Sequence, residues 1–403
     1  MQHPVKKKMA PVFRAAEGGL FSCVEKADVG ASYQELERQG VALMGWADPF
    51  MPDHSMPEFV EDAYAEAARR ESAAHYTAPI GSPELKLAIA EKLRRQNGLD
   101  VDPERNILIT PGSDSGLFFA ILPFIQPGDE VIIPSPSYPN NFLDVRIAGG
   151  VPVAVELKAE NRYQLDPEAL QAAITPKTKM VLLTHPNNPT TTVFNRTSLE
   201  ALSKVIIDND LVLVCDQAFE DFTYENEMIT PAALPGMFER TVTVFSFSKG
   251  MGFSGLRVGY IVCCDSIMDP LFATAVAVVG ATSTAAQQAA TVALQHPGFM
   301  KQFETAYDKR RHRAVEILNS VPGVHVMLPE SGFLCWVDVS ELGDSTEIAA
   351  YLTAEARVSV NDGKNYGQGG AGHLRIVLGV YRDDERVFAA LEAVRDALLR
   401  YKK

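Results

Sequence analysis

The feature that most limits the possible folds is a regular alternation of short apolar runs with helix-like segments between residues 107 and 263. Helical patterns follow the first run at 116–125 and precede a later one at 199–209. Strands that alternate with helices form mostly parallel sheets that are buried on both faces. We therefore predict an α/β fold whose mostly parallel seven-stranded sheet contains the runs 107–110, 131–134, 151–157, 180–184, 211–215, 242–245 and 258–263.

The pattern changes after Pro297-Gly298, where a long charged helix begins. Fewer strands and longer helices follow, which is typical of a smaller α+β domain. We predict three segments: an N-terminal arm, 1–45, that belongs to the small domain; a large cofactor-binding domain, 46–298; and the small C-terminal domain, 299–403. The predicted elements of the last segment are helices at 300–319, 346–355 and 384–400 and strands at 332–339 and 374–378, with a mobile glycine-rich loop at 363–372.

Composition excludes several classes of protein. The net charge of −14 argues against a nucleic-acid partner, and no apolar run reaches the length of a membrane span. The five cysteines are odd in number and lack a CxxC spacing, so we predict buried free thiols in a reducing cytoplasm. The sequence predicts no metal site; His185 is the one histidine that stands beside a candidate motif.

The strongest chemical signal is Lys249, which follows the apolar run 242–245 and the hydroxyls of Ser246 and Ser248. Arg257 stands eight residues further on, between glycines. A lysine amine can form a Schiff base with a carbonyl cofactor, and serines with an arginine are suited to a phosphate dianion. These parts predict a site for pyridoxal 5′-phosphate (PLP). A lone lysine at a strand end would be better explained as a surface residue.

Four other predicted strands end in residues that fit the same cofactor. Ligands of open α/β sheets bind at these carboxyl ends. Gly112-Ser113-Asp114 precedes a helix and offers backbone N–H groups to an anion; taken alone, the segment is better explained as an N-cap formed by Ser113 or Asp114. Tyr138 is suited to stack on a planar ring, or to pack in a turn. Asn188 can donate to a phenolate oxygen, or serve a buried turn. Asp216 ends an apolar strand, where a pyridinium N–H would be its partner.

With these residues in place, the chain resembles the class I/II aminotransferases, which are fold type I PLP-dependent enzymes related to aspartate aminotransferases. The similarity extends from about residue 43 to 399 and includes the segment 76–85, Tyr-Thr-Ala-Pro-Ile-Gly-Ser-Pro-Glu-Leu. The resemblance implies that Lys249 holds the cofactor as an internal aldimine and shuttles the substrate proton, and that Arg375 grips the α-carboxylate. It also implies a homodimer with shared sites. The implied cofactor contacts are Asp216 for the ring nitrogen, Asn188 for the phenolate oxygen, Gly112, Ser113, Asp114, Ser246, Ser248 and Arg257 for the phosphate, and Tyr76 for the phosphate of the partner subunit.

The chain departs from the family pattern at three positions. Phe219 stands three residues after the aspartate, where a tyrosine usually donates to the phenolate oxygen; without it, the pKa of the aldimine should rise. Thr191 and Ala47 replace customary glycines, and Trp46 and Ala47 are expected to shape the substrate pocket. With Phe13, Phe21 and Phe50 also expected near the site and no second arginine evident, a neutral or aromatic amino acid is favoured as donor.

The main hypothesis is therefore an aminotransferase that moves an amino group between an α-amino acid and a 2-oxo acid such as 2-oxoglutarate. The alternative is another PLP reaction on the same fold, namely β-elimination, decarboxylation or oxidation, which Phe219 motivates. A PLP-binding regulator would need a DNA-binding module, for which residues 1–45 are too short. A nucleotide-dependent dehydrogenase would need a G-x-G-x-x-G segment after a strand, which the sequence lacks.

Overall fold

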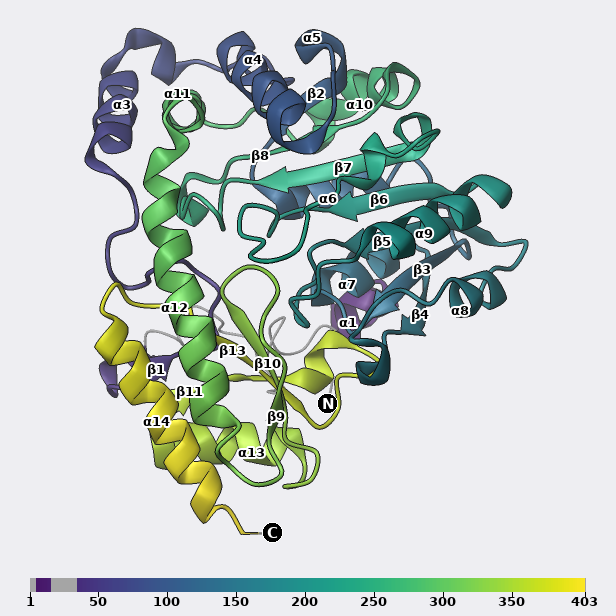
Figure 1. Ribbon diagram of the computed structural model, residues 1–403. Coiled ribbons are helices and arrows are strands. Elements are labelled where there is room, and N and C mark those ends of the chain that lie inside the picture. Colours follow the sequence, from purple (N-terminus) through teal and green to yellow (C-terminus); the bar gives the residue numbers. More distant parts are fainter. Residues whose placement is uncertain (1–4, 16–34, 403) are drawn as a thin grey trace.

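The computed structural model describes residues 5–15 and 35–402 (Figure 1). Within these residues, seven strands form one sheet in the order β2-β8-β7-β6-β5-β3-β4. Only β8 runs antiparallel to its neighbours, β2 and β7, so the predicted mostly parallel seven-stranded sheet is confirmed. The strands are β2 (Ile107–Thr110), β3 (Glu130–Ser135), β4 (Val151–Glu156), β5 (Thr178–Thr184), β6 (Val212–Asp216), β7 (Thr241–Ser246) and β8 (Gly259–Val262).

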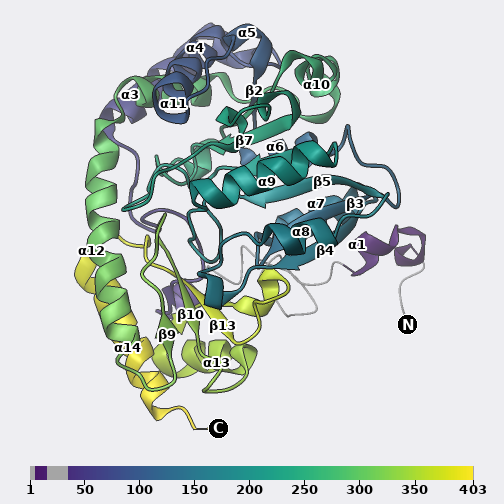
Figure 2. The same ribbon diagram turned by 45° about the vertical axis from the view of Figure 1, so that its right-hand side comes forward.

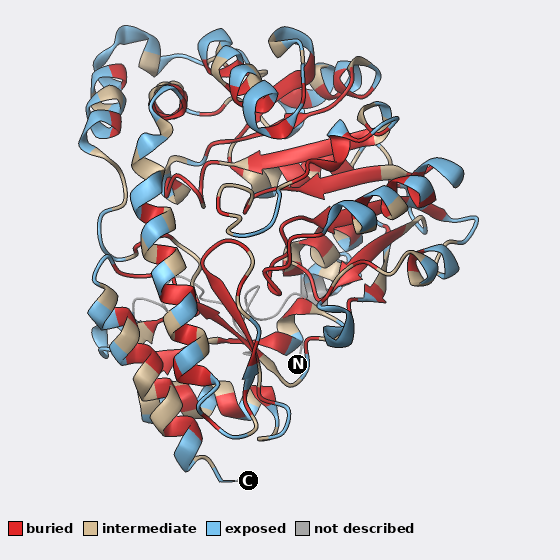
Figure 3. Ribbon diagram, viewed as in Figure 1, coloured by how far each residue is buried: buried red, intermediate tan, exposed pale blue. Residues whose placement is uncertain are grey.

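Both faces of this sheet are covered, and its strands are buried along most of their length except at the edge strand β4 (Figure 3). Successive side chains of a strand point to opposite faces, so Ile132 packs against one set of helices and Ile133 against another. The face of Ile132 is covered by α8 (Pro167–Ala172) and α9 (Arg196–Asp208), and that of Ile133 by α6 (Ser113–Ile121) and α10 (Asp265–Val278).

Further helices surround the sheet. Ser82 caps α4 (Pro83–Lys92) by accepting from Leu85 N, and Pro83 stands at the first position of this helix. The helix continues as the π-helical turn Leu93–Asn97 and ends at Gly98. The remaining helices of this part are α3 (Glu58–Arg69), α4 (Pro83–Lys92), α5 (Pro103–Asn106), α7 (Pro139–Ile147) and α11 (Thr284–Gln295), and α1 (Pro11–Ala15) lies near the N-terminus.

Two small sheets lie at the other end of the molecule, and the long helix α12 (Met300–Leu318) runs from the region of α11 down to them (Figures 1 and 2). One small sheet is antiparallel, in the order β12-β13-β10-β9, and the other pairs β1 in parallel with β11. The division at 45/46 and 298/299 stays a prediction. The elements are β1 (Ala42–Leu43), β9 (His325–Val326), β10 (Leu334–Asp338), β11 (Val358–Ser359), β12 (Asn361–Asp362), β13 (His373–Val377), α13 (Ser345–Tyr351) and α14 (Asp384–Arg400).

The glycine-rich segment 363–372 is packed between the two parts of the molecule. Tyr366 is fully buried, and its carbonyl accepts from Ser137 N at 2.9 Å. A Cβ on Gly363 would lie 2.2 Å from the carbonyl oxygen of Gly370, so glycine is needed for two backbone stretches to pass in contact. The mobile loop that we predicted here does not match this packing, because the glycines serve close approach.

Candidate active site

The carboxyl ends of the large sheet border a pocket with a volume of about 490 Å³. Strands of an open α/β sheet present their ligand-binding residues at this edge. Most of the residues predicted from the sequence line this single pocket, although they come from seven separate stretches of the chain. The predicted residues in its wall are Trp46, Ala47, Ser113, Asp114, Tyr138, Asn188, Asp216, Phe219, Ser248, Lys249, Arg257 and Arg375.

Lys249 reaches the pocket from the turn that follows β7. Its Nζ donates a hydrogen bond to Ala47 O at 2.5 Å, which ties the lysine to the segment after β1. Burial lowers the pKa of this amine, and the carboxylates of Asp48 and Asp114 partly oppose the shift. A lowered pKa increases the fraction of unprotonated amine, which is the nucleophilic form.

Asp216 is the last residue of β6 and is almost completely buried. Its Oδ1 accepts a hydrogen bond from Ala218 N at 3.0 Å. Burial raises the pKa of the carboxyl to about 7. A buried carboxylate is costly without a cationic partner, so this position favours a ligand that brings a positive charge.

Gly112, Ser113 and Arg257 form a compact cradle at the N-terminus of α6. Gly112 has a positive φ of 82°, and a Cβ on it would lie 2.3 Å from Arg257 Nη2. A Cβ on Gly259 would likewise lie 2.7 Å from Ser113 N. Backbone N–H groups at a helix start, together with a guanidinium, are the donors that phosphates bind. Ser246 does not line the pocket wall itself, but its Oγ accepts from Ser248 N at 3.1 Å.

Arg375 enters the pocket from β13 and is 2% exposed. It stands opposite Trp336 of β10 and Asn361 of β12 in the register of the small sheet. Its guanidinium donates to Asn188 Oδ1 at 3.2 Å, to Gly45 O at 2.9 Å and to Asn361 Oδ1 at 2.6 Å. These three acceptors orient the guanidinium in the pocket wall.

Phe219 lies at the back of the pocket and is held by other side chains. Its ring centroid is 5.6 Å from that of Phe333, and Lys249 Nζ lies 5.9 Å from the centre of the Phe219 ring. A Cβ on Gly332, which has a φ of 61°, would lie 2.8 Å from Phe219 Cδ1. The ring therefore fills its place through packing, in a position where it offers no hydrogen-bond donor.

Some predicted residues lie elsewhere. Tyr76 is 97% exposed and lies outside this pocket, as does Gly112 of the cradle. Phe50 is buried against Tyr307, with 5.4 Å between the ring centroids, and does not line the pocket. Phe13 is exposed on α1, and Phe21 lies outside the described residues.

Sequence reasoning missed five residues of the pocket wall: Asp48, Asn140, Ala218, Ser254 and Gly255. Asp48 directly follows Trp46 and Ala47, so its place in the same segment was a usable signal. Ser254 donates to Asp48 Oδ1 at 2.5 Å, a contact between residues 206 positions apart that no local pattern predicts.

His185 has a structural role. Its Nε2 lies 3.0 Å from Ile229 O, and its ring stacks on Phe194. Burial lowers the pKa of the imidazole to about 4, so the neutral ring is favoured.

Comparison with known proteins identifies the family. Residues 45–394 match the model for aminotransferase class I and II. The chain belongs to this family. The aspartate aminotransferase of Musicola paradisiaca is 33% identical over 359 residues, which cover 87% of this chain and 88% of that protein. The aromatic-amino-acid aminotransferase 2 of Thermococcus litoralis is 31% identical over 343 residues, which cover 84% of this chain and 87% of that protein.

A solved structure supports the same assignment. The aspartate aminotransferase of Thermus thermophilus with maleate superposes with a TM-score of 0.87 at 32% identity, covering 98% of this chain and 100% of that chain. The chain is thus a PLP-dependent transferase with the fold type I architecture.

The pocket of this aminotransferase fits the PLP on which its family depends. Asp216 supplies a buried carboxylate that needs a cationic partner. The cradle of Gly112, Ser113 and Arg257 leaves no room for a Cβ yet presents phosphate donors. The buried carboxylate therefore fits the basic ring nitrogen of the cofactor, and the backbone N–H groups and the guanidinium fit its phosphate.

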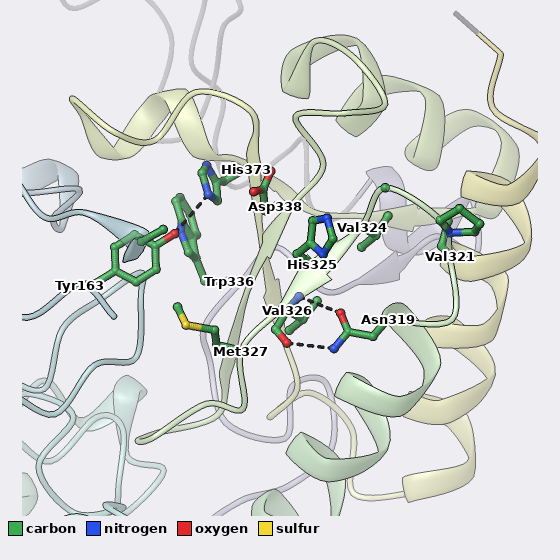
Figure 4. A pocket seen from close by; sticks show the side chains of 13 residues that line it. Tyr163, Asn319, Val321, Val324, His325, Val326, Met327, Trp336, Asp338 and His373 are labelled. Carbon is green, nitrogen blue, oxygen red and sulfur yellow. Dashed lines mark hydrogen bonds between the residues drawn. The ribbon is translucent and has the colours of Figure 1, made fainter. Parts of the chain in front are cut away.

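A second cavity, of about 400 Å³, lies away from the aminotransferase site, between the segment around Tyr163 and the small antiparallel sheet (Figure 4). Tyr163 Oη lies 3.2 Å from His373 Nε2, and the His373 ring stacks on Trp336 with 4.9 Å between centroids. Across the cavity, Asn319 holds Val326 through hydrogen bonds to both its N and its O. None of the residues predicted for the active site lines it.

One group of possible metal ligands, Glu225, Asp308 and His312, lies near the surface in the described part of the chain. Arg311 forms ion pairs with both Glu225 and Asp308. The two carboxylates therefore already have a cationic partner. Separately, no helix among residues 5–15 and 35–402 combines the length and apolar character that crossing a membrane requires.

Proposed function

We propose that this aminotransferase transfers an amino group between a neutral or aromatic α-amino acid and a 2-oxo acid. The observation that carries the proposal is that one pocket is lined by Asp216 at the end of β6, Lys249 in the turn after β7 and Arg375 of β13 in the small sheet. Trp46 and Tyr138 add aromatic surface to the same wall, which supports an apolar substrate side chain.

Each residue has a role that its surroundings support. Asp216 holds the ring nitrogen, Asn188 the phenolate oxygen, and Tyr138 the ring face. The phosphate is held by Gly112, Ser113, Asp114, Ser246, Ser248 and Arg257, with Tyr76 of the partner subunit. PLP, when bound, supplies the carbonyl group and the electron-withdrawing ring that make the substrate Cα–H acidic.

Arg375 binds the α-carboxylate through a charge-assisted pair, and its contacts with Asn188, Gly45 and Asn361 hold the guanidinium in the pocket wall for this task. Lys249 Nζ accepts the proton that leaves the substrate Cα, because burial lowers the pKa of this amine toward the range in which it acts as a base. Asn188 connects the two binding tasks, since its Oδ1 already accepts from Arg375 Nη1 at 3.2 Å.

The proposal includes a homodimer with shared sites. The 97% exposure of Tyr76 supports it, because a large aromatic side chain gains from burial against a partner. The four described cysteines are buried free thiols, which agrees with the reducing cytoplasm that we predicted; Cys23 lies outside the described residues.

Phe219 motivates a second candidate, β-elimination, decarboxylation or oxidation on the same scaffold, which the named relatives do not favour. The two are separated by assaying 2-oxo acid formation from an amino acid with and without an added 2-oxo acid acceptor. Transamination predicts sustained turnover only with the acceptor. Equal turnover without it, with release of ammonia, would reject the proposal.

Lys249→Ala tests the central residue. We expect loss of the yellow absorbance of the lysine-bound cofactor and of turnover. Retention of a borohydride-reducible link to the protein in this variant would assign the chemistry to a different amine. Lys92→Ala is a suitable control, because Lys92 is also buried but its Nζ is bound by Asn97 Oδ1 at 2.9 Å and by Glu220, away from the pocket.

A further inference from the structure

The charged residues of the pocket do not balance once the proposed contacts are made. The described wall carries three cations and three carboxylates, namely Lys249, Arg257, Arg375, Asp48, Asp114 and Asp216. In the proposed function, on which this inference rests, each cation has a partner on the cofactor or the substrate α-carboxylate, and Asp216 has the ring nitrogen. The carboxylates of Asp48 and Asp114 are left over, because Asp114 can bind the phosphate only through its backbone N–H. A substrate side chain that extends along the remaining wall therefore meets negative charge.

Asp114 is the better organised of the two leftover carboxylates. Its Oδ1 accepts from Tyr138 Oη at 3.1 Å and from Asn140 Nδ2 at 3.4 Å, and Asn140 Nδ2 also lies 3.2 Å from Tyr138 Oη. Both donors are neutral, so the trio keeps the negative charge of its carboxylate. Burial, with the neighbouring Asp114 charge, raises the pKa of Tyr138 well above its usual value, so the hydroxyl stays a donor.

The cation that pairs with Asp114 is Arg257, whose Nη2 lies 3.8 Å from Asp114 Oδ2. The Asp114 charge also acts on Lys249, where it partly opposes the lowering of the pKa of the amine by burial. Arg257 belongs to the phosphate cradle, where a dianion competes for its charge. Asp48, the other leftover carboxylate, has a neutral donor of its own, Ser254 Oγ at 2.5 Å.

We propose that Asp114, held by Tyr138 and Asn140, determines the substrate class by repelling a second carboxylate, so that amino acids and 2-oxo acids with uncharged side chains are preferred over dicarboxylates. Like charges brought together at a binding site reduce affinity and act as a specificity element. Because the two half-reactions of a transaminase use one site, the same discrimination applies to the acceptor. A monocarboxylic 2-oxo acid such as pyruvate should then replace the 2-oxoglutarate that we expected from the sequence.

Amide and acid pairs of equal shape give the sharpest test. With the holoenzyme, we expect kcat/KM of the half-reaction to be higher for glutamine than for glutamate, and for asparagine than for aspartate, by about tenfold or more. Pyruvate should likewise exceed 2-oxoglutarate as acceptor. Glutamate and 2-oxoglutarate performing as well as their uncharged counterparts would overturn the inference but leave the aminotransferase intact. Failure of every amino acid to convert the cofactor would instead reject the proposed function.

Asp114→Asn assigns the effect to the residue, since the amide keeps the shape and removes the charge. We expect the glutamine-to-glutamate ratio to fall by about tenfold. Binding of succinamate and succinate, measured by their perturbation of the cofactor absorbance, provides a readout without turnover: the preference for succinamate should narrow in the same variant. Asp48→Asn is the matched control, with the same change of charge in the same wall. An equal or larger change in the ratio for Asp48→Asn would overturn the assignment to Asp114.

Discussion

Arg310 and Arg375 are both buried, but Arg310 lies against the turn between β13 and α14 and Arg375 lines the pocket. Arg310, on α12, donates through Nε to Asp384 Oδ1 at 2.7 Å and through its Nη atoms to the carbonyl oxygens of Leu378, Val380, Tyr381 and Arg382. All five N–H groups of a guanidinium are thereby used, and its charge is balanced by a carboxylate. Arg375, on β13, is oriented by two amide side chains and one backbone carbonyl, all of them neutral.

This difference separates structural from functional charge. A buried cation that is neutralised within the chain fixes the geometry of the segments around it, here the turn between β13 and α14. Arg375 instead lines the pocket wall, where a ligand of opposite sign can reach it. Asp216 lines the same wall and is a buried carboxylate whose Oδ1 accepts from a backbone N–H.

Arg310→Met should have the largest effect on stability. The change leaves four backbone carbonyls without their donor and removes one of the two cations that bind Asp384, so we expect a loss of about 3–5 kcal/mol in the free energy of unfolding. Urea unfolding of the holoenzyme measures it. Lys309→Met is the control: Lys309 Nζ binds Asp384 Oδ2 at 2.7 Å but is exposed, and its removal should cost less than about 1 kcal/mol. Equal losses from the two variants would contradict the structural role of Arg310.

Arg375→Met should show the reverse pattern. We expect kcat/KM for every amino acid to fall by about 100-fold or more, because a charge-assisted bidentate pair is lost. The free energy of unfolding should change less than in Arg310→Met, since Arg375 donates to one backbone carbonyl and two side-chain amides, whereas Arg310 donates to four backbone carbonyls and a carboxylate. Arg375→Lys keeps the charge but not the planar fork and should recover only part of the activity. An unchanged KM together with a stability loss as large as that of Arg310→Met would place both arginines in the same structural class.

Much of the candidate site could be predicted from the sequence, because the signals lie in neighbouring residues of the chain. The strand ends that carry Asp216 and Lys249 were visible because apolar runs stop abruptly at polar residues, and the burial of Arg375 followed from its neighbours Ile376 and Val377. The start of α4 was visible in Ser82-Pro83, and α14 was predicted at its exact bounds.

What could not be predicted depends on contacts between distant segments. The acceptors of Arg375 come from residues 45, 188 and 361, and no periodicity relates these positions. The packing of 363–372 was missed because glycine favours both mobile turns and close backbone approach, and only the neighbouring carbonyl of Gly370 decides between them. The burial of Arg310 was not predicted, because it is one of many charged residues in its helix and no neighbouring residue shows that this one faces inward.

Asp216→Asn offers the finest test, through the pH dependence of stability in the cofactor-free protein. The pKa of Asp216 is raised from 3.8 to about 7, so the folded protein binds more protons than the unfolded chain between these values. Asp216 therefore costs stability that is absent at about pH 4 and complete by about pH 7. The amide keeps the Oδ1 that accepts from Ala218 N, so the stability of the variant relative to wild type should rise over this window, by on the order of 3 kcal/mol. The raised pKa of Asp144 and the lowered pKa of His185 also make stability depend on pH, but they are common to both proteins and cancel in the difference. Urea midpoints of both proteins, measured from pH 4.5 to 7.5, give that difference directly. A difference that does not change with pH would mean that the charge of Asp216 is already neutralised within the chain, as that of Arg310 is. Asp216 would then not be available to pair with a ligand.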